Sequence, residues 1–246
     1  MLGLPDATLA CLFDLDGVVT QTALVHAAAW KETFDEFLRE RANQTGTAFV
    51  PFDKVREYDR YVDGKPRLAG TRSFLAARGI ELPEGDQDDP PTAHTVNGLS
   101  NRKNALVLEM IEKQGVQVYE GSVRYIRRVR AAGLSTAVVS SSANTVQVLD
   151  VAGIADLFDA RIDGVIAKEQ GLAGKPAPDT FLAGAKALGV APARAVVFED
   201  ALAGVEAGRA GHFGLVVGVN RTGQAQALAE HGADIVVSDL EELLGK

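Results

Sequence analysis

Cysteine is nearly absent from this chain of 246 residues, and long apolar runs are absent altogether. Its one cysteine, Cys11, cannot form an internal disulfide, and its place inside a short apolar run indicates a buried, unreactive thiol. No uninterrupted apolar stretch is long enough to cross a bilayer, and residues 1–8 leave no room for a signal peptide. We therefore expect a cytoplasmic protein with no membrane partner.

An excess of positive charge is also lacking. The chain has 33 acidic against 25 basic residues, which gives a formal net charge of −8. This balance argues against nonspecific binding to nucleic acid or to an anionic membrane surface, so a phosphate substrate would need a local basic pocket. There is no internal repeat and no tract biased enough to indicate disorder. The 46% of hydrophobic residues can fill one large domain or two modest ones.

Short apolar runs alternate with helical segments from about residue 119 onward, as a parallel α/β sheet requires. Including the first apolar run, the pattern predicts strands at residues 9–13, 134–140, 160–163, 195–199, 215–219 and 235–237. It predicts helices at residues 144–151, 178–188, 202–210 and 223–231, and a short one from residue 240. The predicted fold is α/β, a doubly wound, Rossmann-like parallel sheet.

Residues 21–116 break this alternation. They contain helical periods but no convincing buried strand, and turn-rich pieces separate the helical stretches at residues 43–46, 63–66 and 83–91. We therefore predict a helical cap domain inserted after the first strand. Residues 1–20 and 117–246 would form the α/β core, and residues 21–116 would form the cap.

Two carboxylates, Asp14 and Asp16, follow the first predicted strand and are themselves followed by Gly17. Ligands of open α/β sheets bind at the carboxyl ends of strands, so these acids stand where chemistry is expected. One carboxylate can attack or bind a metal while the other serves as general acid and base. A solvated Asp-x-Asp-Gly turn, or half of a calcium loop, would have the same letters.

Three further polar groups are expected at strand ends of this α/β region. The serines at 140–142 can hold a phosphate at a helix N-terminus or simply cap that helix. Lys175 stands between glycine and proline, which suggests a positioned cation, although most loop lysines are simply solvated. Glu199 and Asp200 are adjacent acids that repel each other unless a cation or hydrogen-bond donors compensate, and Mg²⁺ suits such oxygen ligands. Asp200 could also cap the following helix.

Taken together and in this order, these four groups resemble the motifs of the haloacid-dehalogenase-like superfamily, and in particular its β-phosphoglucomutase-like family. Such members read F-D-L-D-G-V, S-x-S-x-N, K-P-A-P-D and E-D-x-x-x-G, and the matching stretches here are residues 13–18, 140–144, 175–179 and 199–204. The resemblance spans nearly the whole chain. It implies Mg²⁺-dependent phosphoryl transfer on a small sugar phosphate.

The resemblance also implies a role for each matched residue. Asp14 would be the nucleophile that forms an aspartyl-phosphate, and Asp16 the general acid and base. Mg²⁺ would be held by Asp14, the backbone carbonyl of Asp16 and Asp200, with Glu199 close by. Phosphoryl oxygens would be bound by Ser140, Ser141 and Lys175. The other matches would contact the substrate: Thr22, His26, Trp30, Gly64, Arg67, Lys103, Ser142 and Asn144.

Some cap positions have a simpler interpretation or depart from the family pattern. Lys103 lies within the apolar stripe of its helix, where a lysine can snorkel, and His26 can be an ordinary packing histidine. Ala143 replaces a residue that is often basic, and Asp63 stands where lysine is common. These departures leave the identity of the sugar open.

Three functions remain to be weighed. We favour a mutase that converts β-glucose 1-phosphate to glucose 6-phosphate, with a sugar-phosphate phosphatase as the alternative. A phospho-accepting receiver module uses similar residues, but it has about half this length, one ordinary domain, and no large cap. A carboxylic-acid dehalogenase would lack the second acid that Asp16 provides. We expect a monomer or a weak homodimer.

Overall fold

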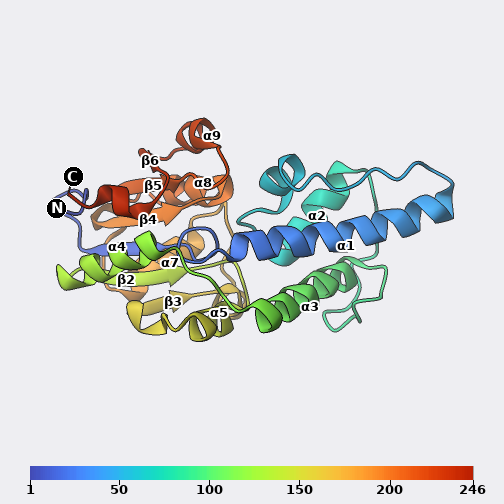
Figure 1. Cartoon of the computed structure of the whole chain (residues 1–246), viewed down its shortest axis with the longest axis horizontal. Coiled ribbons are helices and arrows are strands. Elements are labelled where there is room, and N and C mark those ends of the chain that lie inside the picture. Colours follow the sequence, from blue (N-terminus) through green and yellow to red (C-terminus); the bar gives the residue numbers. More distant parts are fainter. Residues whose placement is uncertain (246) are drawn as a thin grey trace. The chain divides into compact units, whose positions relative to one another are not determined.

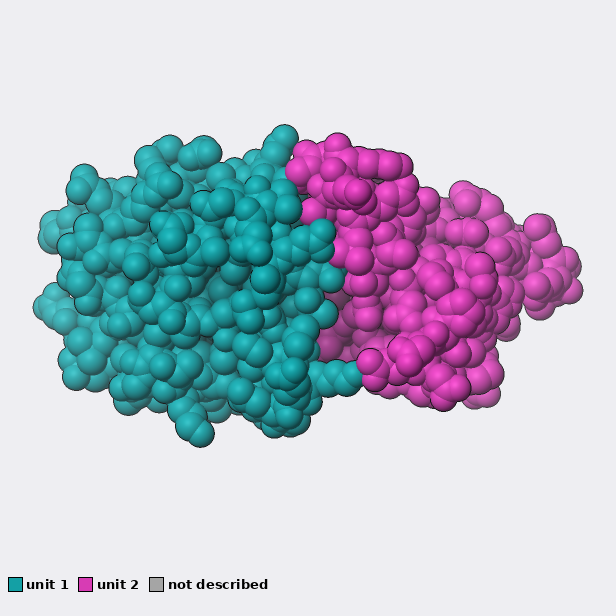
Figure 2. Space-filling view, turned by 90° about the horizontal axis from the view of Figure 1, so that it is seen from below, with its two compact units in different colours: residues 1–22, 116–246 teal, residues 23–115 magenta. Residues whose placement is uncertain are grey.

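The computed structural model describes residues 1–245, which divide into two compact units (Figure 2). The larger unit contains Met1–Thr22 and the chain from Val116 onward, and the smaller unit is Ala23–Gly115. Across residues 1–245, no helix is long and apolar enough to cross a membrane.

The larger unit is built on six parallel strands in the order β3-β2-β1-β4-β5-β6 (Figure 1). They are β1 (Ala10–Phe13), β2 (Ser135–Val139), β3 (Ala160–Ile162), β4 (Ala195–Glu199), β5 (Leu215–Val219) and β6 (Ile235–Val237). The predicted fold class is confirmed, and each predicted strand agrees with its observed one within a residue at either end. Central strands of a parallel sheet are covered on both faces, which is why they are readable as uninterrupted apolar runs.

The strand order reverses between β1 and β4, because β1 pairs with β2 on one side and with β4 on the other. Such a reversal separates the connections on the two sides of the sheet and leaves a crevice at the carboxyl ends of the strands. Asp14 follows β1 and Glu199 ends β4, so the two acids emerge from neighbouring strands. The topology thereby brings together groups that are far apart in the sequence.

Helices connect the strands, and the predicted ones are all present. They are α5 (Thr145–Ala152), α7 (Asp179–Ala187), α8 (Leu202–Ala210) and α9 (Ala225–Glu230). The segment predicted from residue 240 is a 3-10 helix, Leu240–Leu243. Two α-helices of the larger unit were not predicted, α4 (Glu120–Ala131) and the short α6 (Gly164–Glu169), and neither were the 3-10 turns Ala155–Leu157 and Pro192–Arg194. Helix α6 begins where the Asp163 carboxylate accepts hydrogen bonds from two backbone amides at 3.0 and 2.9 Å, an ordinary N-cap.

Successive residues of β1 pack on opposite faces of the sheet. Leu12 joins Phe181 of α7 and other buried side chains in one core cluster. Phe13 instead stacks on Phe198 with ring centroids 4.5 Å apart, and Tyr125 of α4 lies 5.6 Å from the same Phe198 ring. Burying one such side chain contributes about 1.5–3 kcal/mol, so the strand that leads into Asp14 is held firmly from both faces.

The smaller unit is helical, with α1 (Thr22–Thr45), α2 (Arg67–Ala77), α3 (Val96–Gln114) and a π-helical turn at Tyr58–Val62. Its core is aromatic: Phe34 stacks on Trp30 at 4.9 Å and on Phe74 at 3.9 Å between ring centroids. The segment between α1 and α2 is tied to this core, because the buried Asp35 accepts a hydrogen bond from the backbone amide of Phe52 at 2.7 Å.

Candidate active site

A buried lysine joins the ends of three strands in the larger unit. Lys175 Nζ lies 2.5 Å from Asp14 Oδ1 and 2.6 Å from Glu199 Oε1. It also donates a hydrogen bond to the carbonyl of Val139, the last residue of β2, at 3.2 Å. Lys175 is 2% exposed, so its charge is shielded from solvent and acts on these partners. Of the interpretations open for Lys175, the structure supports a positioned cation and not a solvated loop lysine.

The charges in this cluster do not balance. Burial raises the pKa of Asp14 well above its ordinary value, and Lys175 offsets only part of this effect, while Glu199 and Asp16 add to it. Burial by itself would lower the pKa of Lys175, but the carboxylates of Asp14 and Glu199 outweigh it and raise that pKa. The lysine is therefore positively charged, and the acids around it favour the arrival of a second cation.

Three carboxylates could hold that cation. Oxygens of Asp14, Glu199 and Asp200 all lie within 4.8 Å of one another, and all three residues are buried. Two glycines make room for these acids: a Cβ at Gly17 would meet Asp200 Oδ2 at 1.8 Å, and one at Gly204 would meet Glu199 Oε1 at 1.8 Å. Because every donor atom is a hard oxygen, the residues fit a divalent cation such as Mg²⁺.

Asp16 is oriented by hydroxyl groups. Thr22 Oγ1 donates to Asp16 Oδ1, and Ser140 Oγ donates to Asp16 Oδ2 at 3.2 Å. The hydroxyls of Thr20 and Thr22 are 2.6 Å apart, and Thr20 also donates to the carbonyl of Leu15 at 3.1 Å. The structure thus places Thr22, expected as a substrate contact, beside Asp16. An acid held in this way has a defined position from which to transfer a proton.

The serine loop is organised by its own hydroxyls. Ser140 Oγ accepts a hydrogen bond from the amide of Ser142 at 3.0 Å, and Ser142 Oγ accepts one from the amide of Asn144 at 3.1 Å. These are serine turns that hold the loop between β2 and α5 in shape. Asn144 occupies the N-cap position of α5, and Ser141 lies in the same loop. Two of the predicted phosphate-binding residues, Ser140 and Ser141, therefore share one turn at the end of β2 with the predicted substrate contacts Ser142 and Asn144.

The remaining predicted contacts lie in the smaller unit. Lys103 Nζ is 2.7 Å from His26 Nδ1 and 5.0 Å from the centre of the Trp30 ring. Lys103 is only 5% exposed, so it does not extend its ammonium to solvent as a snorkelling lysine would. Arg67 is the first residue of α2; burial lowers its pKa, and its Nε has no hydrogen-bond partner among residues 1–245. Gly64 has a φ of +67° in the turn before α2.

Sequence reasoning missed some residues that shape the site. Gly204 was predicted only as the last position of the fourth motif, although the absence of a side chain there leaves the space that Glu199 fills. Arg221 and Gln224, in the loop after β5, contact the backbone of Gly17 and Asp200. The signal that could have found them is their position after an apolar strand, which is the rule that identified the acids.

Similar proteins of known family identify the family of this chain. The matching family model, haloacid dehalogenase-like hydrolase, covers residues 8–212. The chain belongs to the haloacid dehalogenase-like hydrolases, in their β-phosphoglucomutase-like branch, and the resemblance predicted from its motifs is confirmed. It is thus an enzyme of a family of phosphatases and phosphomutases, whose chemistry implies a divalent metal ion.

Particular relatives are similar along nearly their full length. The chain is 57% identical to a β-phosphoglucomutase of Mycobacterium tuberculosis, over 99% of this chain and 94% of the relative. It is 31% identical to a β-phosphoglucomutase of Bacillus subtilis, over 95% of this chain and 91% of that protein. The crystal structure of a β-phosphoglucomutase from Clostridium difficile matches with a TM-score of 0.75 at 25% identity, over 97% of this chain and 94% of that one.

Proposed function

We propose that this protein is a Mg²⁺-dependent mutase that converts β-glucose 1-phosphate to glucose 6-phosphate through an aspartyl-phosphate. The observation that carries the phosphoryl-transfer chemistry is the buried contact of Asp14 with Lys175 beside Glu199 and Asp200. Phosphoryl transfer depends above all on positioning and on neutralising charge, and this cluster supplies both. The choice of sugar phosphate is supported by the 57% identity to the mycobacterial β-phosphoglucomutase.

In the proposed reaction, a carboxylate oxygen of Asp14 attacks the phosphorus atom and the bond to the sugar oxygen breaks. Asp16 gives its proton to that leaving oxygen and later takes a proton from the hydroxyl that accepts the phosphoryl group. Lys175, Ser140 and Ser141 would hold the phosphoryl oxygens. The charge of Lys175 offsets the repulsion between the anionic nucleophile and the anionic phosphate.

The metal-binding part of the proposal rests on the same residues. Asp14, the backbone carbonyl of Asp16 and Asp200 would hold Mg²⁺, with Glu199 close by. When bound, Mg²⁺ would neutralise charge between the nucleophile and the phosphate. Because burial and neighbouring carboxylates raise the pKa of Asp14, a bound cation would also favour the ionised nucleophile.

We infer that residues 21–116 form the cap that selects the substrate. Arg67 and Lys103 would grip the phosphate that is not being transferred, and the buried Nε of Arg67 supports this, since a buried donor calls for an acceptor. A sugar bisphosphate carries a phosphate at each end, so one grip serves both half-reactions. The sugar itself would contact Thr22, His26, Trp30, Gly64, Ser142 and Asn144.

A sugar-phosphate phosphatase is the second candidate. It would use Asp14, Asp16 and Lys175 in the same way, with water in place of the sugar hydroxyl as acceptor. The description of the family as hydrolases supports this second candidate.

One assay separates the two candidates. β-Glucose 1-phosphate is supplied with Mg²⁺, with and without a trace of glucose 1,6-bisphosphate, and both glucose 6-phosphate and free phosphate are measured. A mutase forms glucose 6-phosphate, faster with the bisphosphate, and releases little phosphate. Free phosphate as the sole product would refute the mutase and identify the phosphatase. Running the same assay over a panel of sugar phosphates identifies the sugar.

A further inference from the structure

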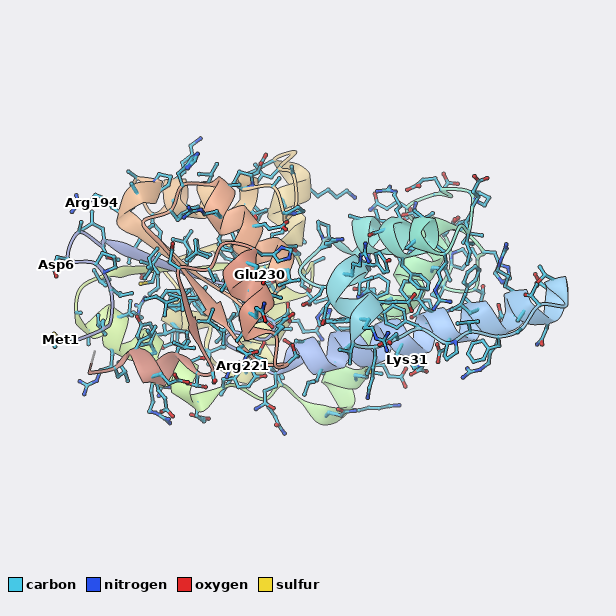
Figure 3. The ribbon with its side chains drawn as sticks, turned by 90° about the horizontal axis from the view of Figure 1, so that it is seen from above. Met1, Asp6, Lys31, Arg194, Arg221 and Glu230 are labelled. Carbon is cyan, nitrogen blue, oxygen red and sulfur yellow. The ribbon has the colours of Figure 1, made fainter. Side chains whose placement is uncertain are left out.

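The loop between β5 and α9 carries two side chains to which the proposed reaction gives no role. Arg221 and Gln224 lie shortly after β5, whose last residue is Val219. Figure 3 labels Arg221, whose side chain is only 13% exposed although it carries a permanent charge. A buried guanidinium needs acceptors, and two of its five acceptors lie on the segment that carries Asp14 and Asp16.

Arg221 holds the backbone directly after Asp16. Its Nε donates to the carbonyl of Gly17 at 2.9 Å, and one Nη donates to the carbonyl of Val18 at 3.4 Å. Two successive peptide groups of the catalytic loop are thereby hydrogen-bonded to one side chain. Hydrogen bonds that involve a charged donor contribute about 1.5–3 kcal/mol each, so this contact opposes any rotation of the loop.

The same guanidinium is anchored elsewhere in the larger unit. It donates to the carbonyl of Ser238 at 2.7 Å, to Asp239 Oδ2 at 3.1 Å and to Ser122 Oγ at 3.3 Å. Its carbon Cζ lies 3.5 Å from the centre of the Tyr119 ring. A guanidinium has five N–H donors in a rigid fork, and with the two loop carbonyls each of them has an acceptor. A lysine could not reproduce this set.

Gly17 connects Arg221 to the expected metal ligands. Its amide donates to the carbonyl of Thr20 at 2.8 Å and its carbonyl accepts from Arg221, so both of its backbone polar groups are engaged. Its φ of +96° and its close approach to the Asp200 carboxylate exclude a side chain there. The peptide that presents the Asp16 carbonyl ends at Gly17, so the orientation of that carbonyl depends on how Gly17 is held.

Gln224 supports the second acidic loop in the same manner. Its Nε2 donates to the carbonyl of Asp200 at 3.0 Å. The backbone amide of Gln224 donates to Asn220 Oδ1 at 2.8 Å. The backbone amide of Asn220 in turn donates to the carbonyl of Val237 at 2.7 Å, and Val237 ends β6, the strand next to β5 in the sheet. One short loop therefore contacts the backbone of both segments that carry the expected metal ligands.

We propose that Arg221 and Gln224 are positioning residues that set the spacing of the two acidic loops and thereby the affinity of the enzyme for its divalent cation. The inference rests on the proposed Mg²⁺-dependent chemistry and adds to it a pair of side chains that touch neither the metal nor the substrate. Residues that orient metal ligands from behind commonly change metal affinity or activity about 10-fold to 100-fold when they are replaced.

The test measures Mg²⁺ binding directly, by calorimetry on the full chain without substrate at 20 °C. The variants are Arg221→Met, Arg221→Lys and Gln224→Ala. The matched controls are Arg209→Met and Gln226→Ala. The side chain of Arg209 is 68% exposed and its ion pair with Asp234 is long, at 3.5 Å, and Gln226 lies on the surface of α9. Thermal unfolding of every variant is followed in parallel by circular dichroism.

We expect Arg221→Met to raise the Mg²⁺ dissociation constant about 10-fold or more. Arg221→Lys should give a smaller rise, and Gln224→Ala, which loses one neutral hydrogen bond of about 0.5–1.5 kcal/mol, a rise of about twofold to tenfold. The controls should match the wild type. Turnover of acetyl phosphate by the Arg221 variants should recover as Mg²⁺ is raised, which a loss of folded protein would not do.

Two results would overturn the inference. If the variants unfold at lower temperature yet bind Mg²⁺ like the wild type, Arg221 and Gln224 only stabilise the fold. If Arg221→Met fails to fold, Arg221→Lys and Gln224→Ala decide, and wild-type affinity in both refutes the inference. A wild-type enzyme that binds no Mg²⁺ and transfers no phosphate would instead refute the proposed function on which the inference rests.

Discussion

Replacing Lys175 with methionine tests whether this lysine holds the acidic cluster together. The substitution keeps most of the side-chain volume but removes a charge that lies 2.5 Å from Asp14 and 2.6 Å from Glu199. All three residues are buried, so the two carboxylates are left without that compensation in a region of low polarity. Removing one partner of a buried ion pair costs about 3–5 kcal/mol. We expect a loss of about 4 kcal/mol in the free energy of unfolding at pH 7.5 without Mg²⁺.

The pH dependence of this loss has a defined sign. Burial raises the pKa of Asp14 in the folded protein, and Lys175 is the main group that opposes the rise, so the variant should have a still higher pKa there. A group with a raised pKa binds its proton more tightly in the folded state, so it contributes stability at low pH that is lost as the pH rises. The deficit of the variant should therefore shrink from pH 8 to pH 5.5, by at most about 1.4 kcal/mol for each pH unit and proton.

Urea denaturation followed by circular dichroism measures this free energy at each pH, with and without Mg²⁺. Lys186→Met, on the exposed side of α7, is the matched control and should unfold like the wild type. Added Mg²⁺ should restore part of the loss, because it supplies positive charge to the same carboxylates. A deficit below about 1 kcal/mol, which is the range of a surface ion pair, would contradict our reasoning. A deficit that grows as the pH falls would contradict it as well.

Further predictions concern turnover. Asp14→Asn should abolish covalent phosphorylation and activity while the fold persists, because an amide is a poor nucleophile. Residual activity above roughly a few per cent, which is far more than loss of a nucleophile leaves, would exclude Asp14 as the phospho-acceptor. Arg67→Ala and Lys103→Ala should each lower kcat/KM for sugar phosphates by about one to two decades, from about 1.5–3 kcal/mol per charged contact, and leave transfer from acetyl phosphate nearly unchanged. Equal losses on both substrates would instead mean that these residues support folding or closure of the cap. Gly204→Ala should displace the Glu199 carboxylate and weaken Mg²⁺ binding measured by calorimetry, since its Cβ would lie 1.8 Å from Oε1; unchanged binding would show that Glu199 plays no part in the metal site. Chelation with EDTA should stop turnover, and added Mg²⁺ should restore it; activity that survives chelation would refute the metal requirement.

The strands and the acids at their ends could be predicted from the sequence because each is a local property. A strand covered on both faces must be apolar throughout, so residues 195–199 are recognisable without any knowledge of their neighbours. Asp14 and Asp16 follow such a run directly, and parallel sheets bind ligands at that end of a strand. The helical character of the segment between residues 21 and 116 is equally local, since it follows from the period of its apolar residues.

The contacts that tune the site were decided only by the tertiary structure. Lys175 is 161 residues from Asp14 in the chain and 24 from Glu199, and Arg221 is 204 residues from Gly17. The local sequence around a lysine or an arginine does not indicate which distant carboxylate or carbonyl it will contact. The contacts between these residues follow from the order of β1, β4 and β5 in the sheet and from the packing that holds the strand ends. The sequence alone therefore specified which groups could do chemistry, whereas packing decided which of them are charged, oriented and held, because these properties depend on burial and on partners far away along the chain.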